Sequence, residues 1–205
     1  MKKKIAIFIL LAVLVYAVGG IVYYFMTREE PKPEAFYMAE IEGYPYKLRS
    51  DATQLMMILF SDLIDVLEAN EINNEEFAKL VGQLFVVDLF TMTNKQNKYD
   101  EGGYLYVYPD HLENFKLNVN DTLYRYLEDN SSGNRTQKLP QVKSIEVESH
   151  EEVEFESGDN IYNGFKFIFN WTYEEDLEYQ DRAEVIVVKV GKFFFVVEKS
   201  VIADE

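Results

Sequence analysis

The 205-residue sequence contains no cysteine. This absence excludes disulfide bonds, thiolate metal sites and a cysteine nucleophile. The chain has two histidines, His111 and His150, and neither stands in a metal-ligand spacing such as HExxH. The phosphate-binding and nucleophile motifs GxxxxGK[ST], GxGxxG and GxSxG are missing as well. We therefore expect no metal, no cofactor and no catalytic residue, and the sequence favours a protein that is not an enzyme.

Basic residues are scarce. The chain has 20 lysines and arginines against 36 aspartates and glutamates, which gives a formal net charge of −16. Binding to nucleic acid depends on basic patches that release counterions from phosphates. We therefore expect no nucleic-acid partner. The acidic surface either meets a basic protein or a cation, or is simply solvated.

One uncharged apolar run stands out near the N-terminus. Residues 5–26 read IAIFILLAVLVYAVGGIVYYFM, which as a helix spans about 33 Å, against a bilayer core of about 30 Å. The run is longer than the apolar region of a signal peptide, so it predicts an uncleaved transmembrane anchor. The lysines of residues 1–4 place that end in the cytoplasm and the remaining chain outside. Gly19 and Gly20 are candidates for close packing of this helix on another.

The remaining chain reads as a linker and one domain. We expect residues 27–49 to form a short linker and an irregular segment, and residues 50–205 to form an extracytoplasmic domain. Ser50 and Asn73 are the expected N-caps of the first two helices. Helical periodicity predicts three helices, near 51–69, 75–92 and 109–126. From residue 142 the period changes to two, which predicts four sequential strands with short turns. The predicted fold class is α+β, with three helices packed on a curved four-stranded antiparallel sheet.

This order of elements resembles the NTF2-like (cystatin-related) superfamily. With one N-terminal anchor and an external domain, it is similar more narrowly to the VirB8 and TcpC-type components of conjugative type IV secretion systems. The resemblance covers the anchor and residues 50–202, and it rests on topology without a signature motif. It implies a cone-shaped domain, a scaffold role, and partners among other envelope proteins or further copies of this chain.

Five residues are candidates for a pocket in such a cone: Asp88, Tyr104, Tyr106, Tyr108 and Trp171. Asp88 falls on the buried face of the second helix, where a carboxylate needs a partner. It is either a polar group of the pocket, or it is held by the glycine loop at 102–103 or by a lysine. The three tyrosines alternate in a segment expected to be short and extended, and they line a mouth or pack as an edge. Trp171 belongs to the pocket or, as we expect, to the core.

The strands near the C-terminus are apolar on both faces, so one face needs a cover other than the helices. We interpret this second face as a protein interface, unless residues 35–49 cover it. Its candidate residues are Ile168, Ile186, Val188, Phe194 and Val196. In the first strand, an acidic stripe of even-numbered residues is expected to line one face, provided that no bulge interrupts it. The stripe consists of Glu146, Glu148, His150, Glu152, Glu154 and Glu156.

These observations predict a membrane-anchored, extracytoplasmic assembly or scaffold protein that binds other envelope proteins or further copies of itself, with a conjugation or secretion channel as the named setting. The alternative is a membrane-tethered module that binds a small ligand, and a third reading is an enzyme with Asp88 as its base. Assembly predicts a filled cone and an apolar outer sheet face. A ligand binder predicts an open pocket of several hundred Å³ lined by aromatics. An enzyme requires in addition a second titratable group beside Asp88.

Overall fold

The computed structural model describes residues 36–202 and, ahead of them, Tyr16, Gly19, Gly20 and Tyr23, which are helical. The chain divides into two units, residues 1–32 and residues 33–205. Within the described residues, we find no helix that is both long and apolar enough to cross a membrane. The anchor predicted at 5–26 falls mostly outside the described residues, as do residues 1–4 and most of the linker. These assignments therefore stay predictions.

The second unit has the predicted α+β order of elements. It opens with a small hairpin of β1 (Tyr37–Glu40) and β2 (Lys47–Arg49). The helical part consists of α2 (Gln54–Glu68), α3 (Asn74–Phe90), the 3-10 helices η1 (Tyr104–Tyr106) and η2 (Pro109–His111), and α4 (Leu112–Asp121). The sheet follows as β3 (Val142–Ser157), β4 (Asn160–Tyr173), β5 (Arg182–Val190) and β6 (Phe193–Val201).

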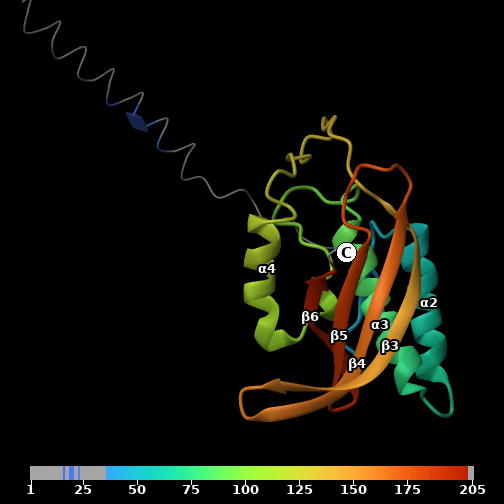
Figure 1. Ribbon diagram of the computed structural model, residues 1–205. Helices are drawn as coiled ribbons and strands as arrows, with labels where there is room; N and C mark the ends of the chain where they lie inside the picture. The colour runs from blue at the N-terminus through green and yellow to red at the C-terminus, as the bar shows by residue number, and fades with distance from the viewer. Residues whose placement is uncertain (1–15, 17–18, 21–22, 24–35, 203–205) are drawn as a thin grey trace, which may run out of the picture. The chain divides into compact units, whose positions relative to one another are not determined.

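The four long strands form an antiparallel meander in the order β3-β4-β5-β6, as predicted. In Figure 1, α3 lies behind the sheet, α2 stands on the side of the β3 edge, and α4 stands on the side of β6. The long β3–β4 hairpin curves strongly and sweeps across toward one end of α4. Gly82 lets α3 approach the sheet, because a Cβ at that position would lie 2.9 Å from the Phe169 ring. The core consequently forms between α3 and the sheet face that carries Phe167, Phe169, Val185 and Val187, all fully buried.

The helix boundaries agree with the prediction at one N-cap and differ at the other. The Asn73 side chain accepts hydrogen bonds from the N–H groups of Glu75 and Glu76, at 3.0 and 3.2 Å, so its prediction as an N-cap is confirmed. The first cap is Thr53 and not Ser50. The Ser50 N–H donates to the carbonyl of Phe36 at 2.8 Å, so this residue still belongs to the β1–β2 hairpin.

The third predicted helix is shorter than its periodicity indicated. It starts with the 3-10 turn η2, and α4 ends at Asp121. Tyr126, which we expected on its apolar face, lies beyond the helix and is 77% exposed. The Thr122 backbone leaves the helical region, and the Tyr124 N–H returns to the carbonyl of Val119 at 2.9 Å. A turn therefore replaces the final helical turn.

A bulge in β3 breaks the predicted acidic stripe. Val147 pairs with Phe169, but Ser149 pairs with Ile168, so Glu148 is an extra residue in the strand. Because side chains alternate with a period of two, one inserted residue moves every later side chain to the other face. After the bulge, His150 lies opposite Phe167 on the helix-facing side. The prediction of one continuous acidic face was therefore wrong.

A similar change of parity divides the predicted interface residues. The two-residue turn at Gly191–Lys192 pairs Val190 with Phe193. Before Val197, odd-numbered residues of β6 therefore lie opposite even-numbered residues of β5. Phe194 and Val196 therefore face the helices and are buried in the core. Ile168, Ile186 and Val188 lie on the other face, so the five residues form no single surface.

That outer face carries ion pairs across its strands and does not form an open apolar patch. Arg182 pairs with Glu148 at 2.8 Å, and Lys166 pairs with Glu151 and, at 3.7 Å, with Glu184. Ile168 and Ile186 are only partly exposed, and Val188 is fully buried. The apolar outer face expected of an assembly subunit is thus replaced by a largely polar one.

Candidate functional site

Asp88 lies in the last turns of α3 and is held by partners on both carboxylate oxygens. Its Oδ1 accepts a hydrogen bond from the Lys95 ammonium at 2.6 Å, and its Oδ2 accepts one from the Gly103 N–H at 2.7 Å. The Lys95 side chain is completely inaccessible to solvent, and that of Asp88 is 7% exposed. A glycine loop and a lysine were the two kinds of structural partner that the sequence suggested, and both are present.

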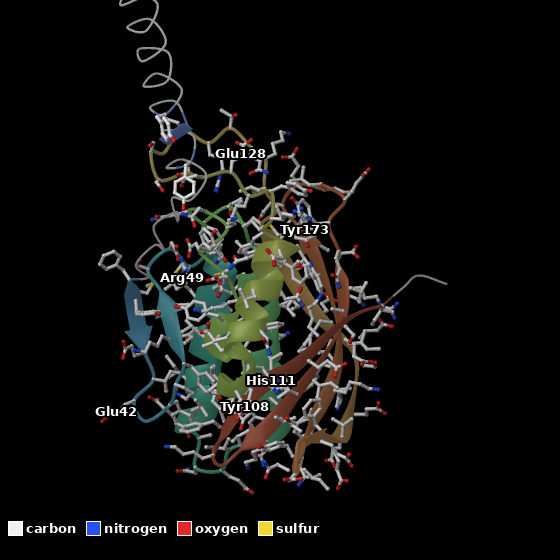
Figure 2. All side chains as sticks on the ribbon, turned by 90° about the vertical axis from the view of Figure 1, so that its left-hand side faces the viewer. Glu42, Arg49, Tyr108, His111, Glu128 and Tyr173 are labelled. Atoms are coloured by element: carbon white, nitrogen blue, oxygen red, sulfur yellow. The ribbon has the colours of Figure 1, made fainter. Side chains whose placement is uncertain are left out.

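The same loop is fixed by a second buried ion pair. The Arg49 guanidinium donates to Asp100 at 2.6 Å and to Asp51 at 2.7 and 2.9 Å. Burial lowers the pKa of Arg49, but the hydrogen bonds to Asp51 and Asp100 outweigh burial and raise its pKa overall. Figure 2 shows Arg49 away from the end of the domain where Tyr108 and His111 lie. These contacts clamp residues 95–103 onto β2 and the end of α3, which is a structural role.

The close approach at this loop depends on glycine. A Cβ on Gly102 would lie 2.0 Å from the backbone oxygen of Asp88. The Tyr124 hydroxyl, which is buried, accepts a hydrogen bond from the Gly102 N–H at 3.2 Å and donates one to the Leu89 carbonyl at 2.8 Å. Burial of this hydroxyl raises the pKa of Tyr124. The Tyr124 hydroxyl thus gives a partner to the Leu89 carbonyl, one of the last carbonyls of α3, which have no partner within the helix.

The three candidate tyrosines do not share one face. Gly103 has a left-handed backbone, with φ of 78°, and it starts a 3-10 helix where we predicted an extended segment. Tyr106 is buried and stacks on Tyr46 with ring centroids 6.2 Å apart, while the Tyr104 hydroxyl lies 2.6 Å from the Tyr37 hydroxyl. Tyr108 packs on Phe195 and Tyr162. The three side chains therefore go to three different surroundings.

Trp171 is a core residue near the C-terminal end of β4. It is 3% exposed, and its ring lies 4.7 Å from that of Phe90. Its Nε1–H donates to the Tyr173 hydroxyl at 2.8 Å. Of the five pocket candidates, only Asp88 and Tyr106 border a common cavity, and that cavity holds about 10 Å³. The structure consequently gathers no site around these five residues.

A larger groove lies between α4 and β6. It has a volume of about 640 Å³. Figure 2 shows α4 facing the viewer, with Tyr108 and His111 at its lower end and the sheet beside it. The floor is apolar because the last turns of α3 and the middle of β6 meet there. The apolar lining consists of Phe85, Leu89, Phe90, Val107, Phe115, Val119, Leu123, Val196, Val197 and Val201.

Polar side chains stand among this apolar lining. They are His111, Asn114, Asn118, Thr122, Gln180, Glu198 and Lys199. Within the part of the chain that the structure describes, no three histidine, cysteine, aspartate or glutamate side chains are grouped to hold a metal ion. The groove therefore combines a hydrophobic floor with a small number of hydrogen-bonding groups, the usual composition of a ligand site.

Lys199 is a positively charged side chain that lines this groove. β6 contains a bulge, because Val187 pairs with Val196 while Ile186 pairs with Glu198. The bulge places Lys199 opposite Val185, on the helix-facing side of the sheet. Its ammonium lies 3.3 Å from Gln180 Oε1 and 5.6 Å from the centroid of the Phe90 ring. Burial lowers the pKa of Lys199.

The edge of β6 is protected along only part of its length. The Tyr46 hydroxyl accepts from the Phe194 N–H at 2.9 Å and donates to its carbonyl at 2.7 Å. Val107 pairs with Val196 in a parallel bridge, and the Tyr108 N–H donates to the Val196 carbonyl at 2.9 Å. Beyond Val196, this edge makes no backbone hydrogen bond to another segment among residues 36–202.

The sequence reasoning missed the groove entirely. None of the five residues predicted for a pocket lines it, and of the five residues predicted for an interface Val196 alone does. A signal was present in the run FFFVVEKSV, where a lysine follows five apolar residues and one acid in a strand. Its orientation toward the helices depends on the bulge, which no local pattern reveals.

Neither the models of known protein families, nor curated proteins, nor solved structures give a match to this chain. The resemblance to NTF2-like proteins and to VirB8-type components therefore stays a prediction that rests on the order of elements.

Proposed function

We propose that this chain is a membrane-tethered binding protein whose α+β domain holds a small, largely apolar ligand between α4 and β6. The observation that supports the proposal is the groove of about 640 Å³ over an aromatic and aliphatic floor. Ligand pockets commonly have about 300–1,000 Å³, mostly apolar walls and a few orienting polar groups. The tether is the uncharged segment at residues 5–26, which has the length and composition of a transmembrane helix.

An enzymatic role for Asp88 has less support. A general base must reach the proton that it abstracts, directly or through one water. Both oxygens of Asp88 are occupied by Lys95 and the Gly103 N–H, and the residue does not line the groove. The Asp88 side chain therefore holds the loop.

An assembly role is the second candidate, in an envelope complex such as a secretion channel. The open edge of β6 beyond Val196 favours it, because an extended partner segment can add to an unpaired strand edge. The polar outer face of the sheet argues against the interface that the sequence predicted there. We therefore place the binding role first.

The test uses Nile red, an uncharged apolar fluorophore, with the full-length chain. Asn114 lies on α4, is exposed and lines the groove, whereas Leu117 lies on the same helix, is 62% exposed and does not line it. Asn114→Trp is expected to fill part of the groove and reduce the fluorescence enhancement, and Leu117→Trp to leave it unchanged. Residues 5–26 are identical in all variants, so binding of dye to that segment cancels in the comparison. Equal enhancement in both variants would refute groove binding.

A further inference from the structure

We propose that the ligand of this groove is an anionic amphiphile, a carboxylate on a hydrocarbon body, and that the Lys199 ammonium binds the carboxylate. This inference rests on the proposed binding function and adds the chemical class of the ligand. Its basis is a cation in a largely apolar groove whose hydrogen-bond partner is a neutral amide oxygen.

The contrast with other lysines carries the first step. Lys47, Lys95 and Lys166 each form a salt bridge with a carboxylate. Lys189, like Lys199, has an amide oxygen as its partner, but it is exposed and does not line the groove. The chain has 36 acidic residues, so carboxylates are abundant. Among the residues that the structure describes, none places a carboxylate oxygen within 4.0 Å of the Lys199 ammonium, and its hydrogen-bond partner is the Gln180 amide oxygen. Among residues 36–202, therefore, no carboxylate already satisfies the attraction of this ammonium for an anion.

Neighbouring groups orient the ammonium without neutralising it. The Gln180 amide nitrogen donates to the Arg182 carbonyl at 2.7 Å, which turns the amide oxygen toward Lys199. Glu198 borders the groove as well, but it lies opposite Ile186 on the outer face of the sheet, and its carboxylate accepts a hydrogen bond from Ser200 at 3.1 Å. Lys199 therefore lies on the groove side of β6, and Glu198 lies on its outer face.

The surroundings of Lys199 also explain why the ligand needs an apolar body. The ammonium lies over the Phe90 ring, and Leu89, Phe90 and Val196 form the adjacent floor. A half-buried ammonium loses hydration there, and burial lowers its pKa. In a ligand that has both parts, the carboxylate supplies a countercharge to the ammonium and the hydrocarbon chain covers the apolar floor. A small hydrophilic anion supplies only the first of these.

The test compares three ligands of one chain length, each below its aggregation concentration: dodecanoate, dodecanol and dodecylammonium. Displacement of Nile red from the full-length chain reports the affinity of each. A charge-assisted hydrogen bond in a partly desolvated site predicts that dodecanoate binds about tenfold or more tightly than dodecanol. Dodecylammonium is expected to bind more weakly than the alcohol.

Four variants assign that preference to its residue. Lys199→Met and Lys199→Gln are expected to remove the advantage of dodecanoate and to leave dodecanol binding within about twofold, whereas Lys199→Arg retains the advantage. Lys192→Met is the matched control, because Lys192 lies in the exposed β5–β6 turn and does not line the groove. A preference for dodecanoate that survives in Lys199→Met and Lys199→Gln overturns the assignment. Equal affinity of the wild-type chain for the alcohol and the carboxylate overturns the ligand class alone, and no binding of any probe overturns the proposed function too.

Discussion

The buried pair of Asp88 and Lys95 offers a quantitative test of the stabilising role assigned to the loop that follows α3. Asp88→Asn removes the negative charge but keeps the shape of the side chain. It leaves the Lys95 ammonium, which has no solvent access, without a countercharge. Breaking a buried ion pair by removing one partner costs about 3–5 kcal/mol, because the remaining charge is uncompensated. The asparagine can also accept only one of the two hydrogen bonds that the carboxylate accepts from Lys95 and Gly103.

This loss is large compared with the free energy of unfolding of a typical domain, about 5–15 kcal/mol. For a domain of this size, 1 kcal/mol shifts the midpoint of thermal unfolding by about 2–4 °C, so the expected decrease is about 6–20 °C. The measurement is the free energy of unfolding from urea titrations followed by circular dichroism, with the thermal midpoint as a second readout. Glu175→Gln is the control, since Glu175 pairs with Lys138 at the surface, where ion pairs contribute about 0–1 kcal/mol.

The double variant Asp88→Asn/Lys95→Met separates the pair from its individual residues. Methionine removes the stranded ammonium, so the double variant is expected to be more stable than the sum of the two single losses predicts, by about 1–3 kcal/mol. Additive losses would show that the two side chains act independently. An Asp88→Asn loss no larger than that of Glu175→Gln would refute the reasoning that this carboxylate holds the loop.

Further predictions concern Tyr46 at the edge of β6, Gly102 in the loop, the loss of stability at low pH through Asp51, and Lys199 in the groove. Tyr46→Phe leaves the paired backbone groups of β6 without their hydroxyl partner and is expected to cost about 1–3 kcal/mol in urea unfolding. Gly102→Ala is expected to cost at least about 1–3 kcal/mol, because its Cβ would overlap the backbone oxygen of Asp88; unchanged stability would exclude the close approach. Burial raises the pKa of Asp51, but the hydrogen bond and charge of Arg49 outweigh burial and lower it. The folded pKa therefore lies below the unfolded value, so this stabilisation is complete above about pH 4 and lost as the pH falls through the lowered pKa. Asp51→Asn is thus expected to destabilise the chain at pH 7 more than at pH 2, as urea titrations at both pH values can check. Lys199→Met is expected to raise the thermal midpoint slightly, because it removes a desolvated charge that pairs with no carboxylate of residues 36–202; a clear decrease would contradict that account.

Periodicity identified the elements well because burial in this domain follows local pattern. The helix over Asn74–Phe90 and the strand over Asn160–Tyr173 both show long, regular runs of apolar side chains. The cap at Asn73 was predictable because it depends on residues within three positions. The α+β fold class and the sequential order of the four long strands follow from such local signals.

The orientation of side chains and the location of the groove could not be predicted in this way. The bulges at Glu148 and Val197 arise where strands adjust their pairing over the curved sheet, and each one reverses the face of all later residues. The partners of Asp88 were predictable in kind, but the pair of Arg49 and Asp100 joins residues 51 positions apart and leaves no local pattern. A groove between α4 and β6 depends on how two distant elements pack, so the sequence indicated neither its walls nor its volume.

The bulge at Val197 has a consequence for how this domain could change over evolution. If the strands paired without the bulge and the sequence were unchanged, the pairing of Val187 with Val196 would continue in register, and Glu198 would lie opposite Val185. The acid would then enter the groove, and Lys199 would turn to the outer face beside Glu184. A change of pairing alone would thus exchange a cationic groove for an anionic one, whereas deletion of Val197 would remove the bulge and keep Lys199 opposite Val185. Related chains that lack Val197 but keep the two residues after it are therefore expected to retain the cation in the groove.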